Sequence, residues 1–339
     1  HYGKTEILKA ANEGAVALVV AACGGHIDVV RLLLDIGCDP DEKERQRHHH
    51  SFTALHAACE GGHLDMVSML VDAGADPNLR ASGNTVLHFA VRTRNIPLID
   101  ILVAADKFNV DQADDVGRTA LHCSIWFKFS HAVDILLDAG ANVNKTDRDG
   151  WTPLRQAIYQ GAIDIVSSII KARPSVVSHV LNDQSTYLHT ACRLGRPCCS
   201  KLLIENGASL EKKDRTGQTP LDHAVTGRRH AVETVKVLLS DDVYPADLVD
   251  QADIDGNTPI HTAVAVQNLD VLKLLVPKSS NMMLRNDRGD TAFALACCTS
   301  QPDIVKHLVD DCLTRCEGRD VKEHLYNLYF GNPEEQEND

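Results

Sequence analysis

Histidine and cysteine are the residues of this chain best suited to chemistry, because both bind metals and both serve in catalysis. The 339-residue sequence contains 17 histidines and 11 cysteines. Five histidines, however, occupy one place in a recurring Thr-x-Leu-His pattern or a close variant of it: His56, His88, His122, His189 and His261. A residue that recurs with a pattern serves that pattern, so we expect these imidazoles to be structural.

Two smaller groups contain the residue types of a metal site. The run His48 to His50 could bind a transition metal, but consecutive residues of a polar loop rarely form a preorganised site. Cys312 and Cys316 share one helix face, yet no second pair of histidines or cysteines stands at zinc-binding spacing from them. We therefore expect no metal site and no cofactor.

Catalytic motifs are equally weak. The phosphate-binding patterns GxGxxG and GxxxxGK[ST] do not occur. No set of nucleophile, base and orienting residue can be assigned either. We expect that the chain is not an enzyme.

Composition narrows the class of protein further. Asp and Glu number 47 against 34 Lys and Arg, and the net charge of −13 argues against nucleic-acid binding through the overall field. The longest apolar run, residues 15–23, is shorter than the roughly 20 residues of a membrane-spanning helix. No secretory signal is apparent and the cysteines are scattered, so we expect reduced thiols and a cytoplasmic or nuclear location. The chain opens on His1, and we expect it to be part of a longer protein.

A repeat supplies the elements that position these residues. The pattern Thr-x-Leu-x-x-Ala recurs, with small variations, at threonines separated by 32, 34, 33, 34, 33, 39 and 33 residues. Those threonines are Thr53, Thr85, Thr119, Thr152, Thr186, Thr219, Thr258 and Thr291. An earlier copy without the threonine begins at Val16, and its Gly25-His26 aligns with Gly62-His63. The repeat therefore predicts nine units.

Each unit predicts two helices. Threonine caps the start of a helix well, and proline suits the first turn, where three units carry it: Pro153, Pro220 and Pro259. In the second half of a unit, as in residues 63–75, apolar residues at i, i+3, i+4 and i+7 form one buried stripe. A glycine such as Gly74 then ends the second helix in a left-handed conformation.

In its period and in its threonine, leucine, alanine and glycine positions, the chain resembles the ankyrin repeat family over roughly residues 4–312. The resemblance implies an all-α fold, an ankyrin-repeat solenoid of about nine helix-turn-helix units with short β-hairpin or loop fingers and capping helices. It also implies that the histidines of the pattern tie adjacent units together. We expect a capping helix at 1–14, repeats at 15–312, a second capping helix at 313–330 and an acidic disordered tail at 331–339.

Several departures from the repeat stand out. Two polar insertions, residues 41–51 and 241–249, lengthen connections and could contact a partner. Gln184 replaces a turn glycine, and Lys128-Phe129 replaces a Gly-His turn. We expect distortion in those two units.

The candidate partner-binding residues are those that the scaffold does not require. In an ankyrin-like unit, the end of the first helix and the turn before the threonine face a groove. The large side chains at such positions are Trp126, Phe127, Trp151, Tyr159 and Gln160, and tryptophan and tyrosine are frequent interface anchors. The alternative interpretation is that Trp126 and Phe127 fill the gap left by the irregular turn that follows them.

The same expected face carries arginines, whose planar guanidinium can bind a carboxylate through two hydrogen bonds. These are Arg92, Arg94, Arg118, Arg148, Arg155, Arg193 and Arg215, with Arg228 and Arg229 at the turn of the seventh unit. The alternative interpretation is ordinary solvated charge. Separately, the segment that ends at Asn144 resembles those that asparaginyl hydroxylases modify, so Asn144 is a candidate for hydroxylation.

The leading hypothesis is a non-catalytic protein–protein interaction module, a scaffold or adaptor. It would bind another protein or peptide, in particular an acidic and apolar segment, in its groove and on its fingers. Two capped ends favour a monomer, and the short longest apolar run argues against membrane insertion. One alternative is the recognition arm of a larger enzyme such as a ubiquitin ligase, although no adaptor-binding helical box is apparent. A third hypothesis, a phosphorylated ligand or nucleotide bound by arginine and tryptophan, is disfavoured by the net charge and the missing phosphate loop.

Overall fold

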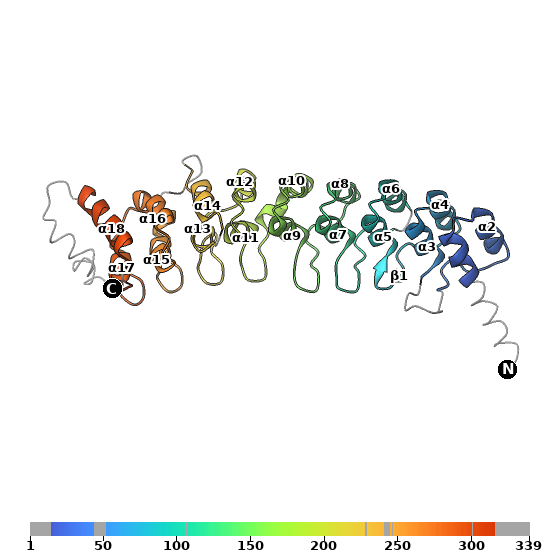
Figure 1. Ribbon diagram of the computed structural model, residues 1–339, viewed down its shortest axis with the longest axis horizontal. Coiled ribbons are helices and arrows are strands. Elements are labelled where there is room, and N and C mark those ends of the chain that lie inside the picture. Colours follow the sequence, from blue (N-terminus) through green and yellow to red (C-terminus); the bar gives the residue numbers. More distant parts are fainter. Residues whose placement is uncertain are drawn as a thin grey trace, which may run out of the picture. The chain divides into compact units, whose positions relative to one another are not determined.

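The computed structural model describes residues 15–43, 52–105, 108–227, 229–240, 245, 247–299 and 301–315. The chain forms two compact units. The first unit consists of His1–Ala157 and Asp164–Arg173, and the second consists of Ile158–Ile163 and Pro174–Asp339. The described parts of both units are built from pairs of short helices joined by loops (Figure 1).

The described residues contain nine such helix pairs. The first helices of the pairs are residues 15–23, α3 (Ala54–Gly61), α5 (Val86–Arg92), α7 (Ala120–Trp126), α9 (Pro153–Gln160), α11 (Tyr187–Arg193), α13 (Pro220–Val225), α15 (Pro259–Ala265) and α17 (Ala292–Cys298). The second helices are α2 (Ile27–Asp35), α4 (Leu64–Asp72), α6 (Ile96–Ala104), α8 (Ser130–Asp138), α10 (Ile163–Ala172), α12 (Pro197–Glu205), α14 (Ala231–Leu238), α16 (Leu269–Leu275) and α18 (Pro302–Arg315). Three short 3₁₀ helices, η1 (Pro174–Ser178), η2 (Leu248–Asp250) and η3 (Val276–Lys278), lie in the connections.

The recurring threonines start the first helices, as the sequence predicts. Thr53 caps α3 by accepting a hydrogen bond from the main-chain nitrogen of His56. In five other first helices the threonine and the residue three positions on form a reciprocal capping box: α5, α7, α11, α13 and α15. The caps satisfy main-chain donors that the first turn of a helix otherwise leaves unpaired.

The apolar core of each unit lies between and within the helix pairs. The small side chains of Ala54, Ala57 and Ala58 on α3 are buried, which allows neighbouring helices to pack closely. The second helices bury one stripe each, as in Met66, Val67 and Leu70 of α4. Successive first helices contact one another. In the first unit α3 contacts α5 and α5 contacts α7, and in the second unit α11 contacts α13, α13 contacts α15 and α15 contacts α17.

Loops between the pairs form the expected fingers. One finger is a β-hairpin, in which β1 (Arg80–Ala81) pairs antiparallel with β2 (Asn84–Thr85). Other fingers fold around a carboxylate: Asp114 Oδ1 accepts from the main-chain nitrogens of Val116 at 2.9 Å and Arg118 at 2.8 Å. Adjacent fingers are joined, since the Arg148 nitrogen donates to the Val116 oxygen at 3.1 Å.

The two irregular turns keep the left-handed backbone that glycine usually supplies. Lys128 has φ 51° and Gln184 has φ 62°. Helices α7 and α8 remain packed on each other around Lys128, and an isolated β-bridge joins Val180 to Thr186 around Gln184. The predicted capping segment 1–14, residues 316–330 of the second cap, the tail 331–339 and most of both insertions lie outside the described residues.

Candidate interaction surface

Four of the five repeat histidines tie their first helix to the next finger. In the first unit, His88 Nε2 lies 2.9 Å from the main-chain oxygen of Arg118, and His122 Nε2 lies 3.0 Å from that of Trp151. In the second unit, His189 and His261 make the same contact with Gln218 and Asp290, each at 3.1 Å. Each ring accepts a hydrogen bond from a threonine nitrogen through Nδ1, so Nε2 carries the proton and donates.

Burial keeps these imidazoles neutral. It lowers the pKa of His56 and of His189 to about 4, and it lowers the pKa of His88, His122 and His261 in the same direction. In His88, His122, His189 and His261 both nitrogens are engaged, which leaves no lone pair for a metal or for proton transfer. The expected structural role is therefore confirmed for these four, whereas His56 contacts Thr53 through Nδ1 and its buried Nε2 has no hydrogen-bond partner among the described residues.

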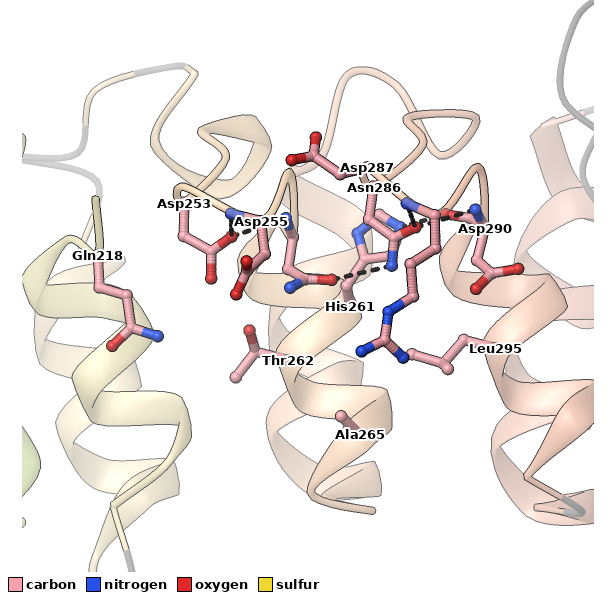
Figure 2. Close-up of a pocket in the computed structure, with 12 residues that line it drawn as sticks. Gln218, Asp253, Asp255, His261, Thr262, Ala265, Asn286, Asp287, Asp290 and Leu295 are labelled. Atoms are coloured by element: carbon pink, nitrogen blue, oxygen red, sulfur yellow. Dashed lines mark hydrogen bonds between the residues drawn. The ribbon is translucent and has the colours of Figure 1, made fainter. Parts of the chain in front are cut away.

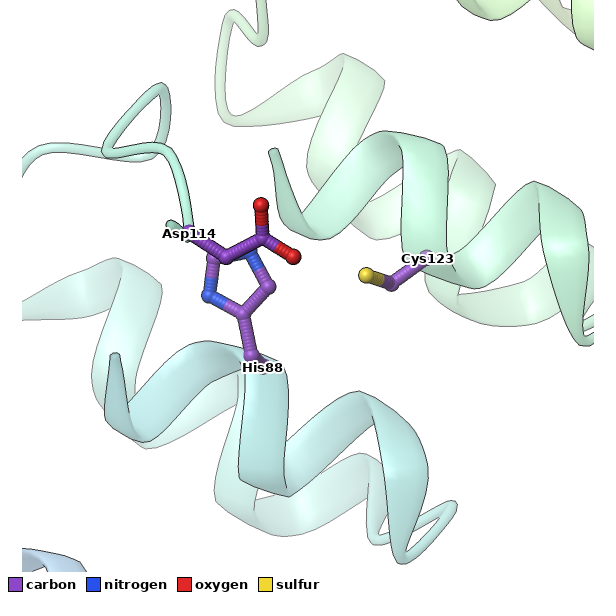
Figure 3. Close-up of side chains that lie close together, drawn as sticks. All are labelled: His88, Asp114 and Cys123. Atoms are coloured by element: carbon purple, nitrogen blue, oxygen red, sulfur yellow. The ribbon is translucent and has the colours of Figure 1, made fainter. Parts of the chain in front are cut away.

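One cluster in the first unit has the composition of a metal site. One ligand atom from each of His88, Asp114 and Cys123 lies within 4.8 Å of the others (Figure 3). Both His88 nitrogens are hydrogen-bonded, and Asp114 accepts from the main chain and the guanidinium of Arg118. Burial raises the pKa of the Cys123 thiol to about 11, away from the thiolate that a metal needs. The three side chains are thus used in packing and hydrogen bonding.

The end of α7 presents two aromatic side chains. Trp126 is 62% exposed and Phe127 is 38% exposed. Arg94, in the turn after α5, donates from Nη2 to the main-chain oxygen of Phe127 at 2.7 Å and lies over the ring of Phe129 at 5.2 Å. This contact fixes the backbone that carries Trp126 and leaves the indole at the surface.

Two further arginines of the first unit lie over aromatic rings. The guanidinium of Arg92, at the end of α5, is 4.6 Å from the centroid of Phe89. That of Arg155, in the first turn of α9, is 4.9 Å from the centroid of Trp151. Stacking on a ring restricts a guanidinium while its in-plane N–H groups stay available. We call this set the arginine–aromatic surface: Arg92, Arg94, Trp126, Phe127, Trp151 and Arg155.

The second unit contains a pocket of about 420 Å³ that the sequence did not predict. Figure 2 shows Asp253 and Asp255 of one finger near Asn286, Asp287 and Asp290 of the next, above Thr262 and Ala265 of α15. The fingers are joined by the Asp287 nitrogen, which donates to the Asp255 oxygen at 3.0 Å. Four aspartates and Arg288 line the pocket, so its charged groups sum to −3. The aspartate that recurs in the fingers is the sequence feature that could have indicated this pocket.

Comparison with known proteins identifies the family to which this repeat belongs. The family description "Ankyrin repeats (3 copies)" matches residues 3–81, 79–147, 107–178, 154–247 and 229–320. The chain belongs to the ankyrin repeat family. Ankyrin repeats generally serve as protein–protein interaction modules, and proteins built of them are typically not enzymes.

Individual ankyrin repeat proteins show similarity over part of their length. The chain is 28% identical over 221 residues to the B-cell lymphoma 3 protein homolog of Mus musculus, covering 63% of the chain and 48% of that protein. It is 29% identical over 201 residues to inversin of Mus musculus, covering 58% of the chain and 19% of inversin. It thus spans less than half of these two relatives.

Two other comparisons cover most of the matched protein. The chain is 33% identical over 200 residues to the probable 26S proteasome regulatory subunit p28 of Saccharomyces cerevisiae, covering 58% of the chain and 85% of p28. The crystal structure of the ankyrin repeat domain of Bcl-3 matches the fold with a TM-score of 0.58 and 24% identity, covering 66% of the chain and 97% of that domain. Among the described helices of the ankyrin repeat chain, none combines the length and the apolar character needed to cross a membrane.

The remaining predicted residues of the ankyrin array are not part of the set defined as the arginine–aromatic surface. Arg118 is engaged in its own finger, where Nη2 lies 2.9 Å from Asp114 Oδ2. Arg148 is an exposed residue of the next finger. In the second unit, Tyr159 is 51% exposed, Gln160 is half-buried, and Arg193 and Arg215 are exposed.

Asn144 is exposed in the first unit, and its main-chain nitrogen donates to Asn142 Oδ1 at 2.9 Å. Its hydroxylation stays a prediction. Several predicted features lie outside the described residues: the run His48 to His50, Cys316 and most of both insertions.

Proposed function

We propose that this chain is a non-catalytic interaction module that binds a segment of another protein through the ends of its first helices, in the cytoplasm or nucleus. The observation that carries the proposal is the exposure of Trp126 at the end of α7, 62% of its area, in a repeat whose other first-helix side chains are buried. An exposed tryptophan offers a large apolar contact area, and tryptophan is a frequent anchor of interfaces.

The equivalent positions of neighbouring repeats support a binding role. Seven residues after the repeat threonine stand Arg92, Trp126, Tyr159 and Arg193, all exposed. The corresponding positions of the last repeats hold Thr226, Ala265 and Cys298. Large aromatic and cationic side chains thus stand at this position within each unit, Arg92 and Trp126 in the first and Tyr159 and Arg193 in the second. Their chemistry favours a partner segment with apolar and acidic side chains.

One relative supports this class of function, because it is named as a probable regulatory subunit of the 26S proteasome. A preordered stack of helices also suits binding, because its surface loses little conformational freedom when a partner docks.

Affinity capture from cell lysate, quantified by mass spectrometry, tests the proposal. The intact chain would be compared with a variant carrying Trp126→Ala and Tyr159→Ala. The matched control carries Leu32→Ala and Ile36→Ala, which remove exposed apolar side chains from the end of the first unit.

We expect a set of proteins captured by the intact chain and by the control to be depleted at least tenfold with the Trp126 and Tyr159 variant. The thermal stability of that variant should stay close to that of the intact chain, because both side chains are exposed. Equal capture by all three proteins would contradict the proposal.

A further inference from the structure

The arginines of the first unit fall into two groups by their ion pairs. Arg80 Nη1 lies 3.4 Å from Asp115 Oδ1, and Arg118 Nη2 lies 2.9 Å from Asp114 Oδ2. By contrast, Arg92 and Arg155 form no ion pair with any residue that the structure describes. In a chain of net charge −13, two guanidinium groups without a carboxylate partner are available to an external anion.

Both guanidinium groups are held in place by aromatic rings. Phe89, beneath Arg92, is 3% exposed, so the ring that supports this guanidinium is itself fixed by the core. Trp151, beneath Arg155, accepts through its main-chain oxygen from His122, which fixes the base of that finger. The Nε of Arg155 is buried without a hydrogen-bond partner, so its side chain is partly desolvated before any ligand arrives. Desolvation strengthens a later bond to a carboxylate.

Trp126 lies on the helix between these two arginines. The Arg94 hydrogen bond to Phe127 links the turn after α5 to the end of α7, and Gln156 Nε2 of α9 donates to the His122 oxygen of α7 at 3.2 Å. Helices packed side by side are about 8–10 Å apart, so Arg92 and Arg155 are separated by roughly 20 Å across two helix spacings. An extended segment rises about 3.3 Å per residue, which makes this span about six residues.

We propose that the arginine–aromatic surface binds an extended segment of a partner protein that carries two carboxylates about six residues apart, with an apolar side chain between them. Arg92 and Arg155 each bind one carboxylate through the guanidinium fork, and Trp126 covers the apolar side chain. This inference rests on the proposed function and adds the spacing and chemistry of the bound segment. The observation that favours carboxylates is the contrast between paired Arg80 and unpaired Arg92.

Selection from a displayed library of random 16-residue peptides tests the proposal without a known partner (the peptide length is about 2.7 times the estimated span of six residues). The intact chain, an Arg92→Gln plus Arg155→Gln variant and an Arg80→Gln control would each be used as bait. Arg80→Gln removes the same charge from an arginine that already has a carboxylate partner. We expect peptides selected on the intact chain and on the control to share two acidic positions about six residues apart with an apolar residue between.

The double variant should lose this acidic preference and bind the selected peptides about tenfold more weakly, since a charge-assisted bond at each end is removed. Arg92→Gln alone, at the exposed end of α5, keeps the test valid if Arg155→Gln unfolds the chain. Selection of peptides with no acidic preference, an unchanged preference in the folded variants, or no selected peptide at all would overturn the inference.

A Trp126→Ala bait separates this inference from the proposed function. If Trp126→Ala abolishes selection while the arginine variants change nothing, the surface binds peptides and only the carboxylate assignment fails. If neither Trp126 nor the arginines affect selection, both proposals fail.

Discussion

Asp222 Oδ2 lies 2.8 Å from both the main-chain nitrogen and the hydroxyl oxygen of Thr219, and both groups donate to it. Five other first helices place a histidine at this position: His56, His88, His122, His189 and His261. Asp222 reproduces the threonine half of the histidine contact, but its Oδ1 is buried without a hydrogen-bond partner. The tie to the next finger is therefore missing from this repeat, as it is from the repeat of His56, whose Nε2 is also buried without a hydrogen-bond partner.

Asp222→Asn is expected to stabilise the chain above pH 6. Burial raises the pKa of Asp222 from its normal value of 3.8 to about 6. The hydrogen bonds from Thr219 lower this pKa, but their effect is smaller than that of burial. The folded chain thus holds this proton more tightly than the unfolded chain, and the contribution of Asp222 to stability declines as pH rises from about 4 through 6. An asparagine can keep the Thr219 bonds and place an uncharged N–H₂ at the Oδ1 position.

Urea unfolding at two pH values checks this prediction. We expect Asp222→Asn to raise the free energy of unfolding by about 1–2 kcal/mol at pH 7.5, the order of cost of a buried unsatisfied group. The gain should shrink at pH 5. A destabilised variant at pH 7.5, or a gain of equal size at both pH values, would contradict this account of Asp222.

His122→Ala should cost about 1–3 kcal/mol of stability, because it leaves the buried main-chain nitrogen of Thr119 without its acceptor and removes one of the two hydrogen bonds to the Trp151 oxygen. His131→Ala in the same repeat is the matched control. His131 is exposed on α8, so its replacement should change the free energy of unfolding by less than about 0.5 kcal/mol. Chemical unfolding of both variants measures the difference, and equal values would remove the tie between helix and finger from the account.

The intact chain should lose stability in mild acid. His56 and His189 have a pKa of about 4 in the folded chain against 6.5 normally, because burial disfavours their charged form. Between pH 6.5 and 4 the unfolded chain therefore binds more protons, and the free energy of unfolding falls as pH decreases through this window. Asp222 and Asp41, whose pKa values burial raises, act in the opposite direction, but they are two groups against five histidines with lowered pKa.

Urea midpoints at pH 7 and pH 5 measure this effect. We expect a lower midpoint at pH 5, and a smaller change in His56→Gln than in the intact chain. An intact chain whose midpoint rises between pH 7 and pH 5 would show that the buried histidines do not dominate its acid response.

Gly195→Ala should be much more damaging than Gly207→Ala. Both glycines have left-handed backbones, with φ 59° and 87°, so each substitution costs about 1–2 kcal/mol. A Cβ at Gly195 would also lie 1.7 Å from the main-chain oxygen of Arg229, whereas nothing lies within 4 Å of one at Gly207. The clash should add about 1–3 kcal/mol for Gly195→Ala. Similar losses in urea unfolding would indicate that the Arg229 loop moves freely away.

The sequence predicted the helix pairs well because their signals are local. A threonine cap, an apolar stripe and a closing glycine each act within a few residues, so α3 and α4 follow from residues 53–74 alone. The histidine tie was also predictable, since the family resemblance implied it and the chain repeats it. Lys128 shows a limit of such local signals. We expected distortion where Lys128-Phe129 replaces the Gly-His turn, yet Lys128 adopts the left-handed conformation that glycine usually supplies.

The candidate surface depended on information that the sequence does not contain. Arg92 and Arg118 look alike in the sequence, yet Arg118 is paired with Asp114 and Arg92 lies over Phe89. Whether an arginine forms an ion pair depends on the direction of its side chain and on the carboxylates near it in the folded chain. The aspartate-lined pocket was missed for the same reason, because it forms only where two fingers lie side by side.

Acrylamide quenching of Trp126 fluorescence tests the central claim most directly. The chain has two tryptophans, so a Trp151→Phe variant reports on Trp126 alone. Trp126 is 62% exposed in the chain by itself, and its fluorescence should be readily quenched. If its surface binds the protein identified by affinity capture, saturating amounts of a tryptophan-free fragment of that partner should reduce quenching several-fold and shift the emission to shorter wavelength. Unchanged quenching and emission with the partner bound would show that the module binds elsewhere.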